Sequence, residues 1–147
     1  KFTNTTDTLL YLASRNEHLE KKIKPALKKK YIVICDRFSD STQAYQAYGR
    51  GVNKFLINAV HKIILRNLKP DLTFILKLKM TKSKQRINKR GIKNRYDKFS
   101  TNFYKRVQNA FIKIAKKNKK RYIILDTSKD DKNVEKLIFN KVSKLIS

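Results

Sequence analysis

Polar side chains suited to binding an anion follow directly on the short apolar run at residues 31–35. Asp36 and Arg37 come first, and hydroxyl, amide and phenol groups follow within ten residues. We expect the run to be a buried strand of a parallel sheet. In open α/β sheets, ligands bind beside the carboxyl ends of the strands. Because a guanidinium there can hold phosphate oxygens with two parallel N–H bonds, the pattern predicts a site for a phosphorylated small molecule.

Arginine is the rarer of the two basic residues, so its positions are informative. The chain holds 28 Lys and 9 Arg. Six of the arginines lie in or beside the polar segments that could form a site: Arg15, Arg37, Arg50, Arg86, Arg90 and Arg95. A planar guanidinium grips a phosphate or a base edge in a fixed geometry that Lys cannot imitate. We expect these arginines to lie in or beside the site.

The formal net charge of +26 also fits a basic nucleic-acid-binding domain, which stays open as an alternative. The excess is mostly Lys spread over exposed helix faces, so we favour a solvated basic surface.

The single cysteine, Cys35, excludes an intrachain disulfide and suits a reducing, cytoplasmic compartment. No apolar run reaches the roughly 18 residues of a membrane span, and His18 and His61, on polar or mixed helix faces, have no zinc-ligand partners.

Helices alternate with strands along the chain. Apolar spacing predicts helices over residues 7–24, 41–48, 54–67, 101–117 and 134–146. A basic helix is expected to begin at Thr81 or Ser83 and to reach Arg90. Short apolar runs predict strands over residues 31–35, 72–78 and 122–125. Thr5 or Thr6, Asn53, and Ser100 or Thr101 are the expected helix caps. Alternation of this kind implies an α/β domain with a parallel sheet and right-handed crossovers.

Three helices carry apolar stripes, and those of the first and third helices would suit an interface between two copies of the chain. Their members are Leu9, Leu12, Leu19 and Ile23 in the first helix, Phe55, Leu56, Val60, Ile63 and Ile64 in the third, and Phe103, Val107, Ala110 and Ile114 in the fifth. Spacing by three or four residues places the members of each stripe on one side of a helix.

Over nearly its whole length the chain resembles the thymidylate kinase (dTMP kinase) family. The resemblance rests on TDTLLYLASRNEH, IKPALKKKYIVICDRF, KPDLTFILKL and YIILDTS, and on Asp-Arg-aromatic followed by Ser-Thr and a tyrosine. It implies a P-loop NTPase-type parallel sheet flanked by helices, with three of the family's five strands present. The chain has no GxxxxGK[ST] motif, and its three glycines are Gly49, Gly51 and Gly91. A phosphate loop needs that motif, so we interpret residues 1–147 as the C-terminal two-thirds of a single thymidylate-kinase-like domain without its central P-loop strand.

The resemblance implies roles for the residues of the acceptor site. By this likeness Tyr11 stacks on thymine and Arg15 meets the base edge. Asp36 and Arg37 hold the acceptor phosphate, Asp36 by hydrogen bonds or through the water shell of Mg²⁺. The other substrate-binding positions are Ser41, Thr42, Tyr45 and Gln46. By this likeness Tyr45 lies against the sugar of the nucleotide and leaves no room for a 2′-hydroxyl.

Residues 82–99 resemble the family's lid, which closes over ATP. The likeness implies that Arg86, Arg90 and Arg95 act in catalysis together with Arg37. The family's lid reads Asp-Arg-aromatic-Glu, whereas this chain has Asn-Arg-Tyr-Asp at residues 94–97, so Arg95 is less firmly tethered. Thr127 and Ser128 match the region that approaches the adenine of ATP.

The implied reaction transfers the γ-phosphoryl group of ATP to dTMP, with Mg²⁺, and gives dTDP for dTTP biosynthesis. The resemblance also implies a cytoplasmic homodimer that associates through helices. We expect the 147-residue chain alone to be inactive and unstable, because the strands at residues 31–35 and 72–78 should flank an empty position. Another nucleotide or deoxynucleoside kinase is the alternative within the enzyme class.

Overall fold

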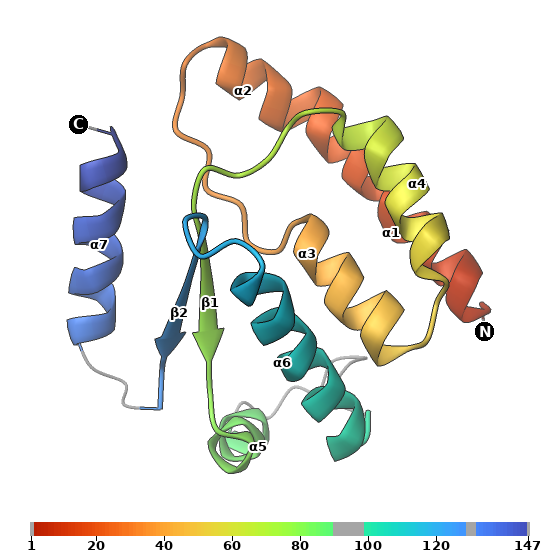
Figure 1. Cartoon of the computed structure of the whole chain (residues 1–147), viewed down its shortest axis with the longest axis vertical. Helices are drawn as coiled ribbons and strands as arrows, with labels where there is room; N and C mark the ends of the chain where they lie inside the picture. Colours follow the sequence, from red (N-terminus) through yellow and green to blue (C-terminus); the bar gives the residue numbers. More distant parts are fainter. Residues whose placement is uncertain (1, 90–98, 129–131, 147) are drawn as a thin grey trace. The chain divides into compact units, whose positions relative to one another are not determined.

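The computed structural model describes residues 2–89, 99–128 and 132–146, which form two compact units, Lys1–Lys69 and Pro70–Ser147 (Figure 1). Each unit has its own helices and buried residues, and the second also holds a parallel sheet. The chain is therefore α/β. The sequence-based expectation of a single domain stays a prediction.

The regular elements in the described part of the first unit are helices. In chain order these are α1 (Asn4–His18), the π-helical segment η1 (Leu19–Ile23), α2 (Lys24–Lys28), α3 (Ser39–Thr42), the π-helical segment η2 (Gln43–Gly49) and α4 (Lys54–Leu65). The cap of α1 is Thr3, whose hydroxyl accepts from the N–H of Thr6 at 3.2 Å, and not Thr5 or Thr6 as predicted. Asn53 caps α4 as predicted, because its Oδ1 accepts from the N–H of Phe55 at 2.8 Å. A cap matters because the first N–H groups of a helix have no partner within the helix.

Burial in the first unit follows the apolar stripe that runs through α1 and η1 but not the stripe of α4. Leu12, Leu19 and Ile23 are buried, whereas Leu9 is 43% exposed. On α4 the predicted members Phe55 and Ile63 are 80% and 72% exposed. The buried side of α4 instead carries Ile57 and His61, one helical turn apart. Apolar residues surround α4, so spacing alone could not select the side that packs.

The strand predicted at residues 31–35 is wrong. The segment has no regular secondary structure and pairs with no strand in the described part of the chain. Its apolar side chains are not buried, since Tyr31 is 63% and Ile34 93% exposed. A strand is defined by the ladder that it shares with a neighbour. The residue types therefore favour extended backbone, but the expected sheet position is not formed, and the three predicted strands become two.

The second unit holds the parallel pair β1 (Thr73–Lys77) and β2 (Tyr122–Asp126), which match the other two predicted strands. Their register runs from Thr73 opposite Tyr122 to Lys77 opposite Asp126. The helices of this unit are α5 (Met80–Lys89), α6 (Thr101–Lys116) and α7 (Lys132–Ile146). Ser100 caps α6 as predicted and accepts from the N–H of Phe103 at 3.2 Å. Parallel strands need a crossover between them, which helices usually provide.

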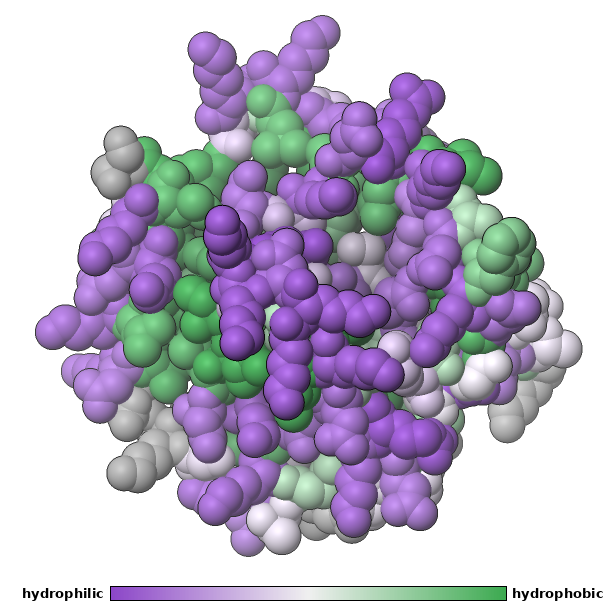
Figure 2. Space-filling view, viewed as in Figure 1, coloured by the Kyte–Doolittle hydropathy of each residue, from purple (hydrophilic) through white to green (hydrophobic). Residues whose placement is uncertain are grey.

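Helix α6 lies against both strands and supplies much of the core of its unit. Phe103, Val107 and Ala110 of its predicted stripe are each 3% exposed or less. Hydrophilic side chains cover much of the face seen in Figure 2, with smaller hydrophobic areas between them. Among the described residues, no helix is long and apolar enough to cross a membrane.

Candidate functional site

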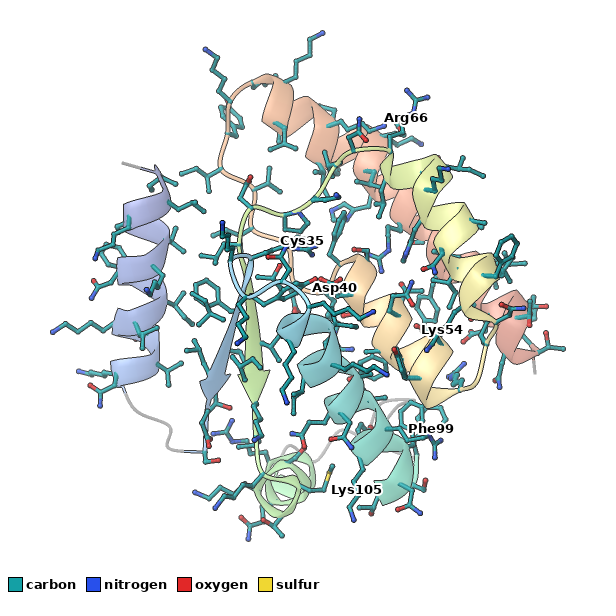
Figure 3. The ribbon with its side chains drawn as sticks, in the orientation of Figure 1. Cys35, Asp40, Lys54, Arg66, Phe99 and Lys105 are labelled. Carbon is teal, nitrogen blue, oxygen red and sulfur yellow. The ribbon has the colours of Figure 1, made fainter. Side chains whose placement is uncertain are left out.

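A turn between residues 31–35 and α3 carries Asp36 and Arg37. Cys35 and Asp40, labelled in Figure 3, lie on either side of it. Arg37 has a φ of 65°, in the left-handed region that non-glycine residues seldom adopt. Its guanidinium carbon lies 4.8 Å from the centroid of the Tyr45 ring, which comes from η2. Arg37 is exposed but held against an aromatic face, so its N–H groups can meet an anion from solvent.

Arg15 joins α1 to α3. Its Nη2 donates to Oγ1 of the buried Thr42 at 3.0 Å, and its guanidinium carbon lies 5.3 Å from the Phe38 ring centroid. Burial lowers the pKa of Arg15, while the nearby Cys35 and Asp40 raise it. Its Nε is buried and has no hydrogen-bond partner among the described residues. The group therefore keeps a donor available in a place where water is largely excluded.

His61, on α4, is a buried neighbour of this guanidinium. The residue is only 8% exposed, and its Nε2 has no hydrogen-bond partner in the described part of the chain. Burial and, to a lesser extent, the positive charge of Arg15 together lower the pKa of His61 to about 4. The sequence placed His61 on a polar or mixed face and did not predict that this side of α4 is buried. His61 is neutral at neutral pH.

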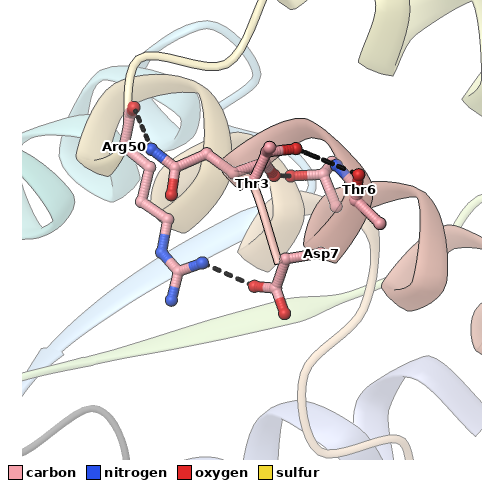
Figure 4. Close-up of polar contacts among 6 residues, drawn as sticks. Thr3, Thr6, Asp7 and Arg50 are labelled. Carbon is pink, nitrogen blue, oxygen red and sulfur yellow. Dashed lines mark hydrogen bonds and ion pairs between the residues drawn. The ribbon is translucent and has the colours of Figure 1, made fainter. Parts of the chain in front are cut away.

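A buried ion pair links the first turn of α1 to the residue after η2. Arg50 Nη1 donates to Asp7 Oδ2, and the two side chains are 7% and 5% exposed (Figure 4). The backbone carbonyl of Arg50 also accepts from Asn4 Nδ2 at 3.3 Å. The sequence singled out Arg50 but not Asp7. The available signal was that Asp7 lies one turn before Tyr11, on the side of α1 that also carries Arg15.

Six of the predicted substrate residues occupy the helices of the first unit. Tyr11 and Arg15 are half-buried on α1, while Ser41, Thr42, Tyr45 and Gln46 lie on α3 and η2. The structure brings Arg15 to Thr42 and Arg37 to Tyr45. Asp36 is exposed, and no hydrogen bond to its carboxylate is seen among the described residues.

In the second unit, three predicted residues meet at the carboxyl end of β2. Arg86 Nη2 donates to the carbonyl of Thr127 at 3.3 Å, and Lys82 Nζ donates to the carbonyl of Ser128 at 2.7 Å. Lys82 was not predicted individually, although it lies one helical turn before Arg86. Hydrogen bonds from the side chain and backbone of Ser128 lower the pKa of Asp126, with a smaller contribution from Lys77 and Lys79.

The remaining lid predictions cannot be located. Arg90 and Arg95 lie outside the described residues, as does most of the predicted lid beyond α5. Among the residues that are described, no group of three or more His, Cys, Asp or Glu side chains could hold a metal ion.

The sequence matches the model of a known protein family over most of its length. The family model for thymidylate kinase matches residues 1–138. The chain belongs to the thymidylate kinase family.

Individual relatives agree with the family model. The chain is 41% identical over 143 residues to the thymidylate kinase of Mycoplasma capricolum, a match that covers 96% of this chain and 65% of the relative. It is 42% identical over 142 residues to that of Mesoplasma florum, covering 93% and 67%. The crystal structure of thymidylate kinase from Ehrlichia chaffeensis superposes with a TM-score of 0.71 at 35% identity, covering 97% of this chain and 66% of that one. The chain thus spans about two-thirds of the length of the relatives it matches.

Proposed function

We propose that this chain is the acceptor-binding part of a P-loop-type kinase that transfers the γ-phosphoryl group of ATP to dTMP and releases dTDP and ADP. Membership of the thymidylate kinase family supports the reaction. The observation that carries the proposal is the pair of arginines in the first unit. Arg15 bonds to Thr42 and Arg37 stacks on Tyr45, so two guanidinium groups are fixed by the helices that bear the proposed nucleoside contacts.

The two arginines have different surroundings, which suits different parts of a nucleotide. Arg15 is largely withdrawn from water and keeps a buried Nε donor, as recognition of a base edge requires. Arg37 is exposed and its charge is open to solvent, as gripping a phosphate dianion requires. Tyr11, one turn before Arg15, is proposed to stack on the base. Ser41, Thr42, Tyr45 and Gln46 complete the nucleoside contacts.

Catalysis of phosphoryl transfer depends mainly on positioning and positive charge. We assign Arg37, Arg86, Arg90 and Arg95 to this role. Thr127 and Ser128 approach the adenine of ATP in this proposal, and the bonds from Arg86 and Lys82 hold their carbonyls in place. The carboxylate of Asp36 would meet Mg²⁺ through the water shell of the ion, which usually keeps several of its waters when it binds substrate phosphates. Bound there, the ion supplies charge neutralisation for the phosphates.

We further propose that the protein is cytoplasmic and forms a homodimer through α1 and α4. Both helices present large apolar side chains to solvent, including Leu9 and Leu10 on α1 and Phe55 and Ile63 on α4. Exposed apolar groups of this size commonly mark sites of association.

Equilibrium binding of dTMP to the full gene product tests the proposal. Arg37→Ala removes the guanidinium at a left-handed position, and Arg66→Ala is the matched control, because Arg66 is also an exposed arginine with a positive φ of 51°. Loss of charge-assisted hydrogen bonds worth roughly 1.5–3 kcal/mol should weaken binding by about 10- to 150-fold in Arg37→Ala, and Arg66→Ala should bind like wild type. Equal effects of the two substitutions refute the assignment of Arg37.

Competing ligands separate the alternative functions. Tighter binding of dUMP, dCMP or thymidine than of dTMP favours a different nucleotide or deoxynucleoside kinase. Sequence-independent DNA binding that weakens steeply with salt, without saturable dTMP binding, favours a basic nucleic-acid binder.

A further inference from the structure

The Asp7–Arg50 ion pair has a position that packing alone does not explain. Both side chains are almost completely buried, although each could have pointed to water from a helix end. Removing two charges from water is costly and is repaid only when the geometry is good. A pair of apolar residues would fill the same space at little or no cost in stability. A buried pair retained in such a place often sets the register of the elements that it joins.

The second polar contact between the same elements defines that register. Arg15 bonds to Thr42 near one end, and Asp7 bonds to Arg50 near the other. Asp7 lies eight residues before Arg15 in the sequence, and its partner Arg50 lies eight residues after Thr42, the partner of Arg15. The two stretches run antiparallel, and the residues midway between the contacts are Tyr11 and Gln46. Gln46 is only 4% exposed.

We propose that Asp7 and Arg50 are positioning residues: their ion pair fixes the register of α1 against α3 and η2, and so sets the distance between the base-contacting residues of the two stretches. The inference rests on the proposed function for its substrate. Neither residue touches the nucleotide in this proposal. They act through Tyr11 and Arg15 on one side and Thr42 and Gln46 on the other.

Several features make the ion pair a good device for this purpose. A guanidinium bonds a carboxylate in a directional way, whereas apolar side chains can slide past one another. The pair is reinforced by the bond from Asn4 to the Arg50 carbonyl, which ties the backbone of the second stretch to the start of α1 (Figure 4). A slip of even one residue along α1 would rotate Tyr11 about the helix axis by about 100°.

The test replaces both charges by apolar groups of similar size, Asp7→Leu with Arg50→Met, in the full gene product. A role in stability alone predicts a changed thermal stability together with wild-type affinity for dTMP. The positioning role predicts near wild-type stability with a Kd for dTMP raised by about tenfold, the loss expected for one misplaced hydrogen bond to a charged group. The exposed pair Glu17–Lys21, which lies where α1 continues into η1, supplies the control, and Glu17→Leu with Lys21→Met should leave the Kd unchanged.

Register is also read without any ligand, by disulfide formation between introduced cysteines in a Cys35→Ser background. Tyr11→Cys with Gln46→Cys should oxidise at least about tenfold faster than Tyr11→Cys with Gln43→Cys, because Gln43 bonds to Asn58 on α4. When Asp7→Leu and Arg50→Met are added to both cysteine variants, their rates of disulfide formation should become similar. If the apolar double variant does not fold, Arg50→Lys replaces it and should give a smaller change in the same direction.

The outcomes separate this inference from the proposed function. A wild-type protein that binds no dTMP refutes the kinase proposal and leaves the register to be judged by the cysteine rates. A double variant that binds dTMP normally, or that keeps the wild-type preference for the pair at positions 11 and 46, overturns the positioning role while the kinase proposal stands.

Discussion

Protonation of His61 should destabilise the folded protein in mildly acidic solution. The imidazole has a pKa of about 4 in the folded state and 6.5 as its ordinary value, because it is buried beside the Arg15 charge. The unfolded chain therefore binds more protons than the folded chain between these two values. Stability is fully present above about pH 6.5 and is lost progressively as the pH falls toward 4.

The size of the effect follows from the two pKa values. Each unit of difference corresponds to about 1.36 kcal/mol, so the full shift corresponds to about 3 kcal/mol at most. Linkage gives a loss of about 2 kcal/mol at pH 5. Partial solvent screening of the imidazole reduces the expected loss to about 1–2 kcal/mol.

Urea unfolding of the full gene product at pH 7.5 and pH 5 measures this loss. His61→Asn removes the titrating group. Between pH 7.5 and pH 5 the variant should therefore lose about 1–2 kcal/mol less free energy of unfolding than wild type loses. His18→Asn is the matched control, because His18 is the other histidine of the chain and is exposed on α1. It should keep the wild-type pH dependence. The reasoning fails if His61→Asn and wild type lose stability equally on acidification.

Two further predictions concern local structure and the isolated chain. Ser100→Ala removes the cap of α6 and should lower the free energy of unfolding by about 1 kcal/mol, which chemical denaturation checks, whereas Thr101→Ser should change it little. The 147-residue chain alone should aggregate or unfold without a cooperative transition, because apolar residues such as Ile32 and Ile34 are exposed in a segment without a partner strand. A sharp and reversible thermal transition of that chain, measured by circular dichroism, would contradict this expectation.

Features encoded by near neighbours could be predicted from the sequence. The caps at Asn53 and Ser100 depend on hydrogen bonds to groups two or three residues away, and both are present. The strands β1 and β2 and the buried residues of α6 also follow their local patterns. These elements are determined by residues within a single helical turn or a short apolar run.

Features that depend on distant partners could not be predicted. Residues 31–35 have the composition of a strand, but a strand also needs a neighbour that their own sequence does not supply. His61 is buried because α4 packs on the side that carries Ile57, and apolar residues on its other sides hid that choice. Asp7 and Arg50 are separated by 43 positions, so no local pattern could pair them. The resemblance to a family, and not periodicity, was what placed Arg15 and Thr42 in one site.

The wide winding of η2 makes this stretch sensitive to the number of its residues. An ordinary helix completes a turn in 3.6 residues, and a π-helical turn takes in one more. Deleting a single alanine here without a change in the winding would swing every later side chain around the axis by roughly a quarter turn. Arg50 would then face away from Asp7. Insertions and deletions between Thr42 and Arg50 should therefore be tolerated far less well than changes of side chain at the same positions.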